Sequence, residues 1–303
     1  MDGMEYDESS FVEAEDGTRL FFGSRGDGPG VPVLLNDGIG CDGFVWRYLQ
    51  PHLAESRRVV HWHYRGHGRS GPPQDHANLT IEGLARDLRL LMDRLNIPEA
   101  VLFGHSMGTQ VELELYRLCP ERVRGLVLLC GSFGRVTHTF HGSDVLSQML
   151  PGIRTVAKRH RGLARAIWGR VPTALALRLA KLSGEVDAVT IREEDFRRYW
   201  EHIAVMDPDV FLELLDAAGE HSAEDLLGVI DVPTLVFAAE RDTFTPPDLA
   251  EAMTQAITGA ELFVLRGGSH AAPVEQPMTV QLRVDKYLAE RVEVAQEPAR
   301  ASA

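Results

Sequence analysis

The segment Gly104-His-Ser-Met-Gly108 constrains the fold of this 303-residue chain more than any other feature. It follows an apolar run, Ala100–Phe103, that predicts a strand, and it precedes Val111–Cys119, which predicts a helix ended by Pro120. A Gly-x-Ser-x-Gly turn in this setting holds its serine at positive φ, and a side chain at position 104 or 108 would collide with neighbouring backbone. Ser106 is therefore a candidate nucleophile at a sheet edge. The alternative is a glycine-rich turn whose serine only caps the helix.

Strand and helix patterns alternate along most of the chain. Two short strands around an Asp16-Gly17 turn predict a β-hairpin. The predicted strands are Phe11–Ala14, Arg19–Phe22, Val31–Leu35, Arg58–His63, Ala100–Phe103, Gly125–Cys130, Val232–Ala239 and Glu261–Leu265. The predicted helices are Phe44–Leu53, Thr80–Leu95, Val111–Cys119, Pro247–Ile257 and Val274–Glu290. Because the strands are apolar and separated by helices, we expect an α/β fold whose mostly parallel sheet is covered on both faces.

The alternation stops between residues 132 and 205, where the patterns are helical. We interpret these residues as a helical cap inserted over the sheet edge at which ligands bind. The predicted organisation is a core domain formed by residues 1–131 and 206–293, a helical cap formed by residues 132–205, and a disordered polar tail formed by residues 294–303.

Charge and composition exclude several classes of function. The net charge of −13 argues against nucleic acid as the main partner, because phosphate binding needs a basic face. The exception is the predicted cap, whose 12 Lys and Arg residues outnumber its 7 Asp and Glu residues. The three cysteines are scattered and form no CxxC pair, so neither a disulfide framework nor a thiolate zinc site is expected. No secretory signal and no apolar run of membrane-spanning length is found, so we expect a cytoplasmic protein without membrane insertion, as a monomer or homodimer.

A serine hydroxyl needs a base, and His270 is the best candidate among twelve histidines. It follows the last predicted strand, on the same sheet edge as Ser106. Asp242 follows Val232–Ala239 at that edge and is the candidate acid that orients His270. Glu240 is its rival, whereas Asp231 precedes its strand and so lies at the opposite edge. Other histidines fit less well. His105 is expected to point away from the Ser106 hydroxyl, and three more are expected on solvated helical faces: His160, His202 and His221.

These motifs resemble the α/β-hydrolase superfamily over nearly the whole chain. The resemblance rests on Gly104-His-Ser-Met-Gly108, Arg65-Gly-His-Gly-Arg-Ser70, Glu240-Arg-Asp242 and Gly268-Ser-His270. It implies an eight-stranded sheet with a helical cap, the chain order Ser…Asp…His and a covalent acyl-enzyme route without a cofactor. A serine at position 106, in place of aspartate, speaks against the haloalkane dehalogenases and epoxide hydrolases of that superfamily, whose ester intermediate needs a carboxylate nucleophile.

The resemblance also implies an oxyanion hole formed by two backbone N–H groups. One is expected from Met107 and the other from Ile39, in the loop after the Val31–Leu35 strand. Relatives usually have His-Gly before the second donor, whereas this chain has Asp37-Gly38. We expect the Asp37 carboxylate to turn away and accept backbone N–H bonds within its loop, and the alternative is contact with a polar substrate group. The candidate substrate-binding residues are Gly38, Cys41, His105 and Phe133.

The expected activity is hydrolysis of carboxylic ester or related acyl bonds in a small to medium, largely apolar substrate. Alternatives with the same three residues are a cofactor-free haloperoxidase or perhydrolase, and a hydrolase of lactones or carbon–carbon bonds. A ligand-binding receptor with a slow or silent triad is the alternative from another class. A metal site at His61, His63 and His67 is disfavoured, because no carboxylate is spaced to complete it.

The predicted cap leaves a further question open. Its apolar faces suit closure of a pocket, with basic residues that are solvated or paired with the acidic core. Recognition of an anionic acyl substrate and weak docking on an anionic membrane are the other two hypotheses.

Overall fold

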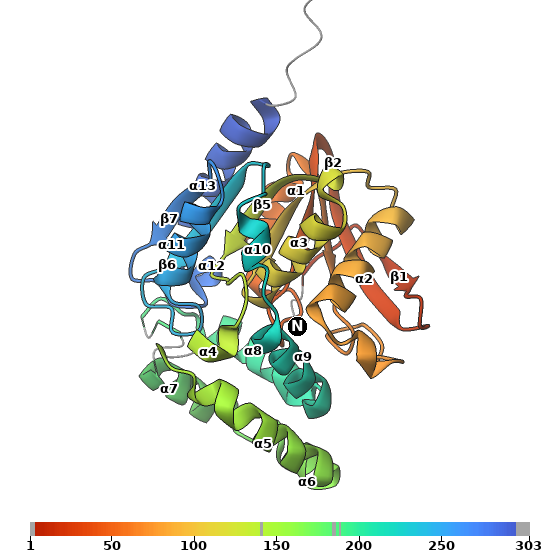
Figure 1. Ribbon diagram of the computed structural model, residues 1–303, viewed down its shortest axis with the longest axis vertical. Helices are drawn as coiled ribbons and strands as arrows, with labels where there is room; N and C mark the ends of the chain where they lie inside the picture. The colour runs from red at the N-terminus through yellow and green to blue at the C-terminus, as the bar shows by residue number, and fades with distance from the viewer. Residues whose placement is uncertain (1–3, 140–141, 184–185, 188, 295–303) are drawn as a thin grey trace, which may run out of the picture.

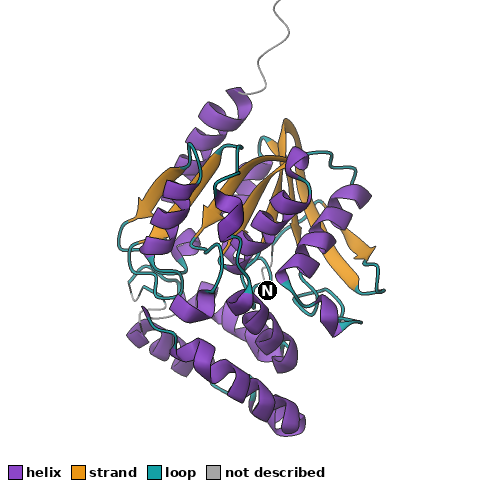
Figure 2. Cartoon of the chain, viewed as in Figure 1, coloured by secondary structure: helices purple, strands orange, loops and turns teal. Residues whose placement is uncertain are grey.

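The computed structural model describes residues 4–139, 142–183, 186–187 and 189–294. A seven-stranded sheet runs through it in the order β1-β2-β4-β5-β6-β7, with β3 paired to β2. Figure 2 shows the strands as an orange layer among purple helices. The strands are β1 Glu8–Glu13, β2 Arg19–Asn36, β3 Arg57–Trp62, β4 Ala100–His105, β5 Val123–Leu129, β6 Thr234–Ala239 and β7 Glu261–Leu265. Strands β2 and β4 to β7 are mutually parallel, which confirms the predicted fold class.

The predicted count of eight strands is wrong. Two predicted strands are arms of one bent strand, β2, which passes through positive φ at Gly26. The first arm pairs antiparallel with β3, with Phe22 opposite Trp62, and the second arm pairs with the same strand, with Leu35 opposite His61. The apolar pattern shows both arms but does not show that the glycine-rich residues between them stay extended.

The sheet separates two hydrophobic clusters, because successive side chains of a strand point to opposite faces. Leu102 and Leu128 belong to one cluster together with residues of α2 and α3. Phe103 and Leu129, their direct neighbours, belong to the other cluster together with residues of α1 and α13. The predicted burial of both sheet faces is therefore confirmed.

The predicted helices form with small differences at their ends. Thr80 caps α2 by accepting a hydrogen bond from the Gly83 N–H. The predicted helix Phe44–Leu53 is divided into η1 and α1, and the closing helix is divided at Pro277, whose missing N–H prevents one continuous helix. The helices of this part are η1 Phe44–Trp46, α1 Leu49–Ala54, η2 His76–Asn78, α2 Ile81–Arg94, α3 Met107–Leu118, η3 Pro120–Arg122, α11 Pro247–Ala256, α12 Ala272–Glu275, α13 Pro277–Tyr287 and η5 Leu288–Glu293.

Helices occupy the chain between β5 and β6, and named strands are absent from the described part of this segment. The helices are α4 Val136–Thr139, α5 Val145–Arg159, α6 Arg161–Ile167, α7 Thr173–Ser183, α8 Glu193–Val205, α9 Pro208–Glu220 and α10 Glu224–Leu227. Figure 1 shows α5, α6 and α7 at the lower end of the view, away from the strands. The domain boundaries at residues 131 and 205 stay a prediction. Apart from Val294, the predicted disordered tail lies outside the described residues.

Candidate active site

Ser106 lies in a tight turn between β4 and α3, in a backbone conformation with φ 55° and ψ −118°. A Cβ atom on Gly104 would lie 2.5 Å from the carbonyl carbon of Gly108, and one on Gly108 would lie 2.2 Å from the carbonyl oxygen of Asn36. Both contacts are too short for any side chain, so the turn needs glycine at both positions. The Ser106 N–H donates to the carbonyl oxygen of Leu129, which fixes the turn to the neighbouring strand.

Loops at the same sheet edge bring His270 and Asp242 to Ser106, as the sequence places them. His270 Nε2 lies 3.0 Å from the Ser106 Oγ, and His270 Nδ1 lies 2.8 Å from Asp242 Oδ2. The buried Asp242 carboxylate also accepts from the backbone N–H groups of Phe244 and Thr245, at 2.8 and 2.9 Å, and from the Thr245 hydroxyl. An imidazole held in this way can take the serine proton, and the Asp242 carboxylate can stabilise the imidazolium that results.

The rival acids lie elsewhere. Glu240 is exposed and accepts a hydrogen bond from the Gly267 N–H. Asp231 Oδ1 accepts a hydrogen bond from the Tyr116 hydroxyl, 2.8 Å away. The hydrogen bonds of these two carboxylates therefore involve other groups. The carboxylate that bonds to His270 is Asp242, as the chain order Ser…Asp…His predicts.

A mostly apolar cavity of about 110 Å³ lies in front of the Ser106 hydroxyl. Three of the four candidate substrate-binding residues line it, namely Gly38, Cys41 and His105. Phe133 is not among them and packs against one of the two hydrophobic clusters. Ile39, the predicted oxyanion donor, also lines the cavity. Most of the remaining lining is apolar or aromatic, and the sequence patterns did not single it out: Phe44, Val186, Ile191, Phe196, Tyr199, Phe244 and Ala271.

His105 lies in the wall of this cavity rather than at the Ser106 hydroxyl. Its Nε2–H donates to the carbonyl oxygen of His270, 3.0 Å away. Burial, reinforced by the charge that His270 can carry, lowers the pKa of His105 to about 3. His105 is therefore neutral at physiological pH and holds the loop of His270 in place.

The two residues predicted to supply oxyanion donors, Met107 and Ile39, both lie close to Ser106. Met107 is the first residue of α3, where N–H groups have no partner within the helix. Ile39 follows Gly38, and a Cβ atom on Gly38 would lie 3.1 Å from the Ser106 Cβ. The loop that carries Ile39 therefore runs directly beside the serine.

Comparison with known proteins decides the family. Residues 31–277 match the model of the α/β hydrolase fold. The chain belongs to the α/β-hydrolase family. It is 30% identical over 280 residues to the dihydrolipoyllysine-residue acetyltransferase component of an acetoin cleaving system from Pseudomonas putida, covering 91% of this chain and 68% of that protein.

Solved structures agree with this assignment. A thermophilic esterase from Thermogutta terrifontis is 25% identical and superposes with a TM-score of 0.75, over 93% of this chain and 98% of that one. The enol-lactonase from Burkholderia xenovorans is 24% identical, with a TM-score of 0.74 over 93% of this chain and 100% of that one.

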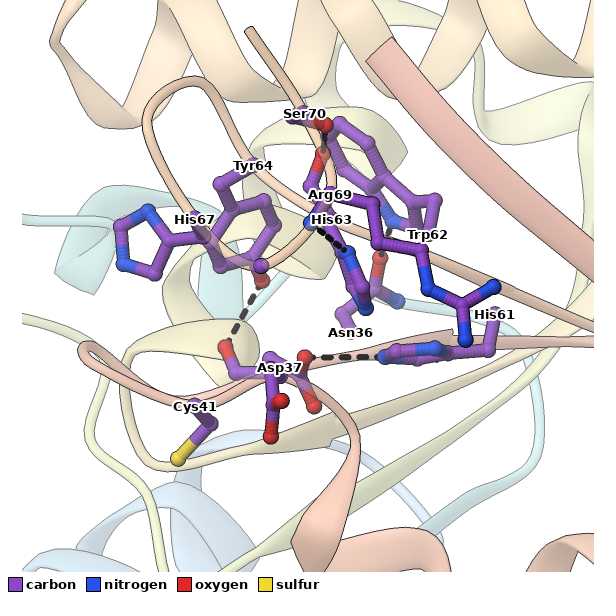
Figure 3. A network of polar contacts seen from close by, with 12 residues as sticks. Asn36, Asp37, Cys41, His61, Trp62, His63, Tyr64, His67, Arg69 and Ser70 are labelled. Carbon is purple, nitrogen blue, oxygen red and sulfur yellow. Dashed lines mark hydrogen bonds and ion pairs between the residues drawn. The ribbon is translucent and has the colours of Figure 1, made fainter. Parts of the chain in front are cut away.

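Asp37, where this α/β hydrolase departs from the usual His-Gly pattern, does not behave as expected. Its carboxylate does turn away, but Oδ2 pairs with the buried His61 imidazole, 2.9 Å from Nε2, and not with amides of its own loop (Figure 3). The other ring nitrogen of His61 lies 2.7 Å from the Tyr6 hydroxyl, and the Tyr64 hydroxyl donates to the Asp37 carbonyl oxygen. A buried carboxylate is stabilised by a strong donor, and His61 supplies one from β3.

Two further histidines hold the loop that carries Ile39, and neither was predicted to do so. His67 Nε2 accepts from the Gly40 N–H at 3.1 Å, and burial lowers the pKa of His67 to about 3. His202, on α8, donates from Nδ1 to the Gly40 carbonyl oxygen and accepts the Gly68 N–H at Nε2, both at 2.8 Å. One imidazole therefore links the helical segment to two loops of the sheet edge.

The expected solvation of the helical histidines holds only in part. His160 is exposed, as expected, but His202 and His221 are buried. His221 lies between Gln110 Nε2, at 3.1 Å, and Glu114 Oε1, at 2.9 Å. The prediction failed for these two because a local polar pattern does not reveal which distant segments pack against it.

The arrangement of His61, His63 and His67 offers no metal site. Groups of three or more potential metal-ligating side chains in suitable positions are absent among the residues that the structure describes. Hydrogen bonds occupy the ring nitrogens of His61 and His67, and His63 Nδ1 accepts the Arg69 N–H (Figure 3). Membrane-spanning helices are likewise absent from the described residues.

Proposed function

We propose that this α/β hydrolase cleaves carboxylic esters or closely related acyl bonds by nucleophilic attack of Ser106. The observation that carries the proposal is the continuous hydrogen-bond series from the Ser106 Oγ through His270 to Asp242, at 3.0 and 2.8 Å. His270 takes the serine proton as Oγ attacks the carbonyl carbon, and it then delivers that proton to the leaving group. Water, deprotonated by the same imidazole, hydrolyses the acyl-enzyme and regenerates Ser106.

The negative charge that forms on the carbonyl oxygen needs donors that are already in place. The N–H groups of Met107 and Ile39 are the proposed pair, since both residues lie close to Ser106 and Met107 begins α3, whose N-terminus is its positive end. Binding of Gly40 by His67 and His202 would keep the Ile39 N–H in position. Pairing of Asp37 with His61 keeps a carboxylate away from the developing charge.

The cavity suggests the size and polarity of the acyl group. Its lining is mainly apolar, and its volume is about 110 Å³. An apolar cavity of roughly 150 Å³ can hold a benzene ring, so we expect an acyl group of that size or smaller. The matched relative named as an acetyltransferase also fits chemistry at a small acyl carbonyl.

Hydrolysis of p-nitrophenyl esters from acetate to decanoate tests the proposal. We expect short acyl chains to react fastest and the Ser106→Ala variant to lose at least about 1,000-fold in kcat. Ser132→Ala is the control, because Ser132 is also buried but its hydroxyl bonds within its own loop, to Gly134. If neither the esters nor a fluorophosphonate probe react at Ser106, the proposal fails.

A further inference from the structure

The helices α5 to α7 have a composition unlike the rest of the chain. Residues 145–183 contain eight Lys and Arg residues and neither Asp nor Glu, in a protein of net charge −13. The remaining residues therefore carry a net charge of −21. Such a separation of charge makes α5 to α7 basic and the rest of the molecule acidic. The basic helices are then attracted to a negatively charged surface.

Apolar exposure concentrates on the same helices. Of nineteen large apolar side chains that are exposed among the described residues, ten lie between positions 145 and 182. We call these ten the α5–α7 face: Val145, Met149, Ile153, Val156, Leu163, Ile167, Val171, Leu175, Leu179 and Leu182. Five of them also line an open apolar groove of about 660 Å³ between α5, α6 and the start of α9. Exposed apolar surface on this scale typically marks an interaction site.

Half of the basic residues are already paired inside the molecule. Four carboxylates of α9 and its N-cap form ion pairs with Arg154, Lys158, Arg161 and Arg165. For Arg159, Arg170, Arg178 and Lys181, by contrast, the structure gives no ion pair with another described residue. Along the sequence these four cations alternate with the exposed apolar side chains, so helices α5 to α7 offer both kinds of contact.

The charges decide which partner fits the α5–α7 face. A second copy docked through the same face would bring two basic surfaces together, because a two-fold interface places each patch against itself. An anionic lipid bilayer supplies negative headgroups for the cations and an apolar layer for the side chains. We propose that the α5–α7 face docks this protein on anionic lipid bilayers.

The salt concentration determines how strongly the acidic residues of the protein are repelled by an anionic bilayer. At an ionic strength of about 0.1 M the Debye length is about 10 Å, so acidic residues of the molecule that lie farther than this from the bilayer are largely screened from it. Basic residues at the bilayer surface act within that distance, and each strengthens binding by about fivefold. The proposal concerns a surface and does not depend on the chemistry at Ser106.

Co-sedimentation with vesicles tests the proposal on the full-length protein. In 100 mM NaCl, we expect binding to vesicles that contain 30% phosphatidylserine, about tenfold or more weaker binding to pure phosphatidylcholine, and loss of binding in 500 mM NaCl. Arg159→Gln with Arg178→Gln should weaken binding by about 25-fold, and Val156→Ser with Leu163→Ser should weaken it by a similar factor.

The matched control is Met278→Ser with Leu282→Ser, which removes two apolar side chains of at least the same exposure from α13 and should leave binding unchanged. Unchanged hydrolysis of a soluble ester, or an unchanged melting temperature, shows that each variant is folded. Absence of sedimentation, or sedimentation that the α5–α7 variants do not reduce, overturns the proposal. A dimer in sedimentation velocity that Leu163→Ser dissociates, without vesicle binding, also overturns it and makes the face a self-association surface.

Discussion

The loops around Ser106 and the helices α5 to α7 depart in opposite ways from the usual rule that polar side chains are exposed and apolar side chains are buried. At the sheet edge, histidines and carboxylates are buried and bonded to one another, as Asp37 is to His61. In α5 to α7, leucine and isoleucine side chains are exposed, as in Leu163 and Ile167. The difference shows that residue type alone does not decide burial, because the number of segments that pack around a position does. The following predictions test this contrast, from the largest expected effect to the smallest.

Asp242→Asn should lower kcat by about 10³- to 10⁴-fold without unfolding the protein. An asparagine amide would donate to His270 Nδ1, so Nε2 would carry the proton and could not accept from the Ser106 hydroxyl. Steady-state kinetics on a p-nitrophenyl ester measure the effect. Arg159→Gln on α5 is the control and should leave kcat unchanged; a loss of less than tenfold in Asp242→Asn would remove this residue from the mechanism.

The same substitution, Leu→Ala, should have very different effects in the two regions. Leu128 is fully buried in β5, so Leu128→Ala should lower the free energy of unfolding by about 2–5 kcal/mol. Leu163 is 62% exposed on α6, so Leu163→Ala should change it by less than about 0.5 kcal/mol. Urea unfolding measures both, and similar values for the two variants would contradict the contrast.

Asp37→Asn should cost stability and spare substrate binding. The carboxylate pairs with buried His61, so its loss weakens a charge-assisted hydrogen bond, and we expect a decrease of roughly 1–3 kcal/mol in the free energy of unfolding. KM for a small ester should stay within about twofold, because the Asp37 side chain faces β3 and not the cavity. A rise of tenfold in KM at unchanged stability would favour direct contact with substrate.

Lowering the pH should lower the free energy of unfolding through the buried His67 at the sheet edge, and the exposed His160 of the helical segment should contribute nothing to this loss. Burial lowers the pKa of His67 to about 3, whereas an unfolded histidine has a pKa of about 6.5. Between these values the unfolded state binds a proton that the native state does not, so the free energy of unfolding falls as pH falls, by up to about 1.4 kcal/mol per pH unit. Above pH 6.5 or below pH 3 this histidine contributes no further change.

Urea unfolding at pH 7, 6 and 5 measures that slope. His67→Asn should reduce the slope, whatever its effect at pH 7, and the exposed His160→Asn should leave it unchanged. An equal slope in both variants would show that burial of His67 does not carry the acid sensitivity.

Local spacing predicted most of the fold and the three residues at its edge. The spacing of the glycines around Ser106, the cap at Thr80 and the alternating strands are each visible within one short segment of the sequence. Features that the local sequence pattern leaves open were predicted less well. The two arms of β2 were predicted as separate strands, and Phe133 was predicted at the cavity, which it does not line.

What the sequence by itself determined was the strand–turn–helix that carries Ser106 and the edge at which His270 and Asp242 follow their strands. Glycine geometry and hydrophobic period are local properties, so one chain segment is enough to read them. Only the tertiary structure decided the partners of Asp37 and His202. His61 lies 24 residues from Asp37, and Gly40 lies 162 residues from His202. A buried polar group bonds to whatever donor or acceptor the fold brings to it, and spacing along the chain contains no record of that neighbour.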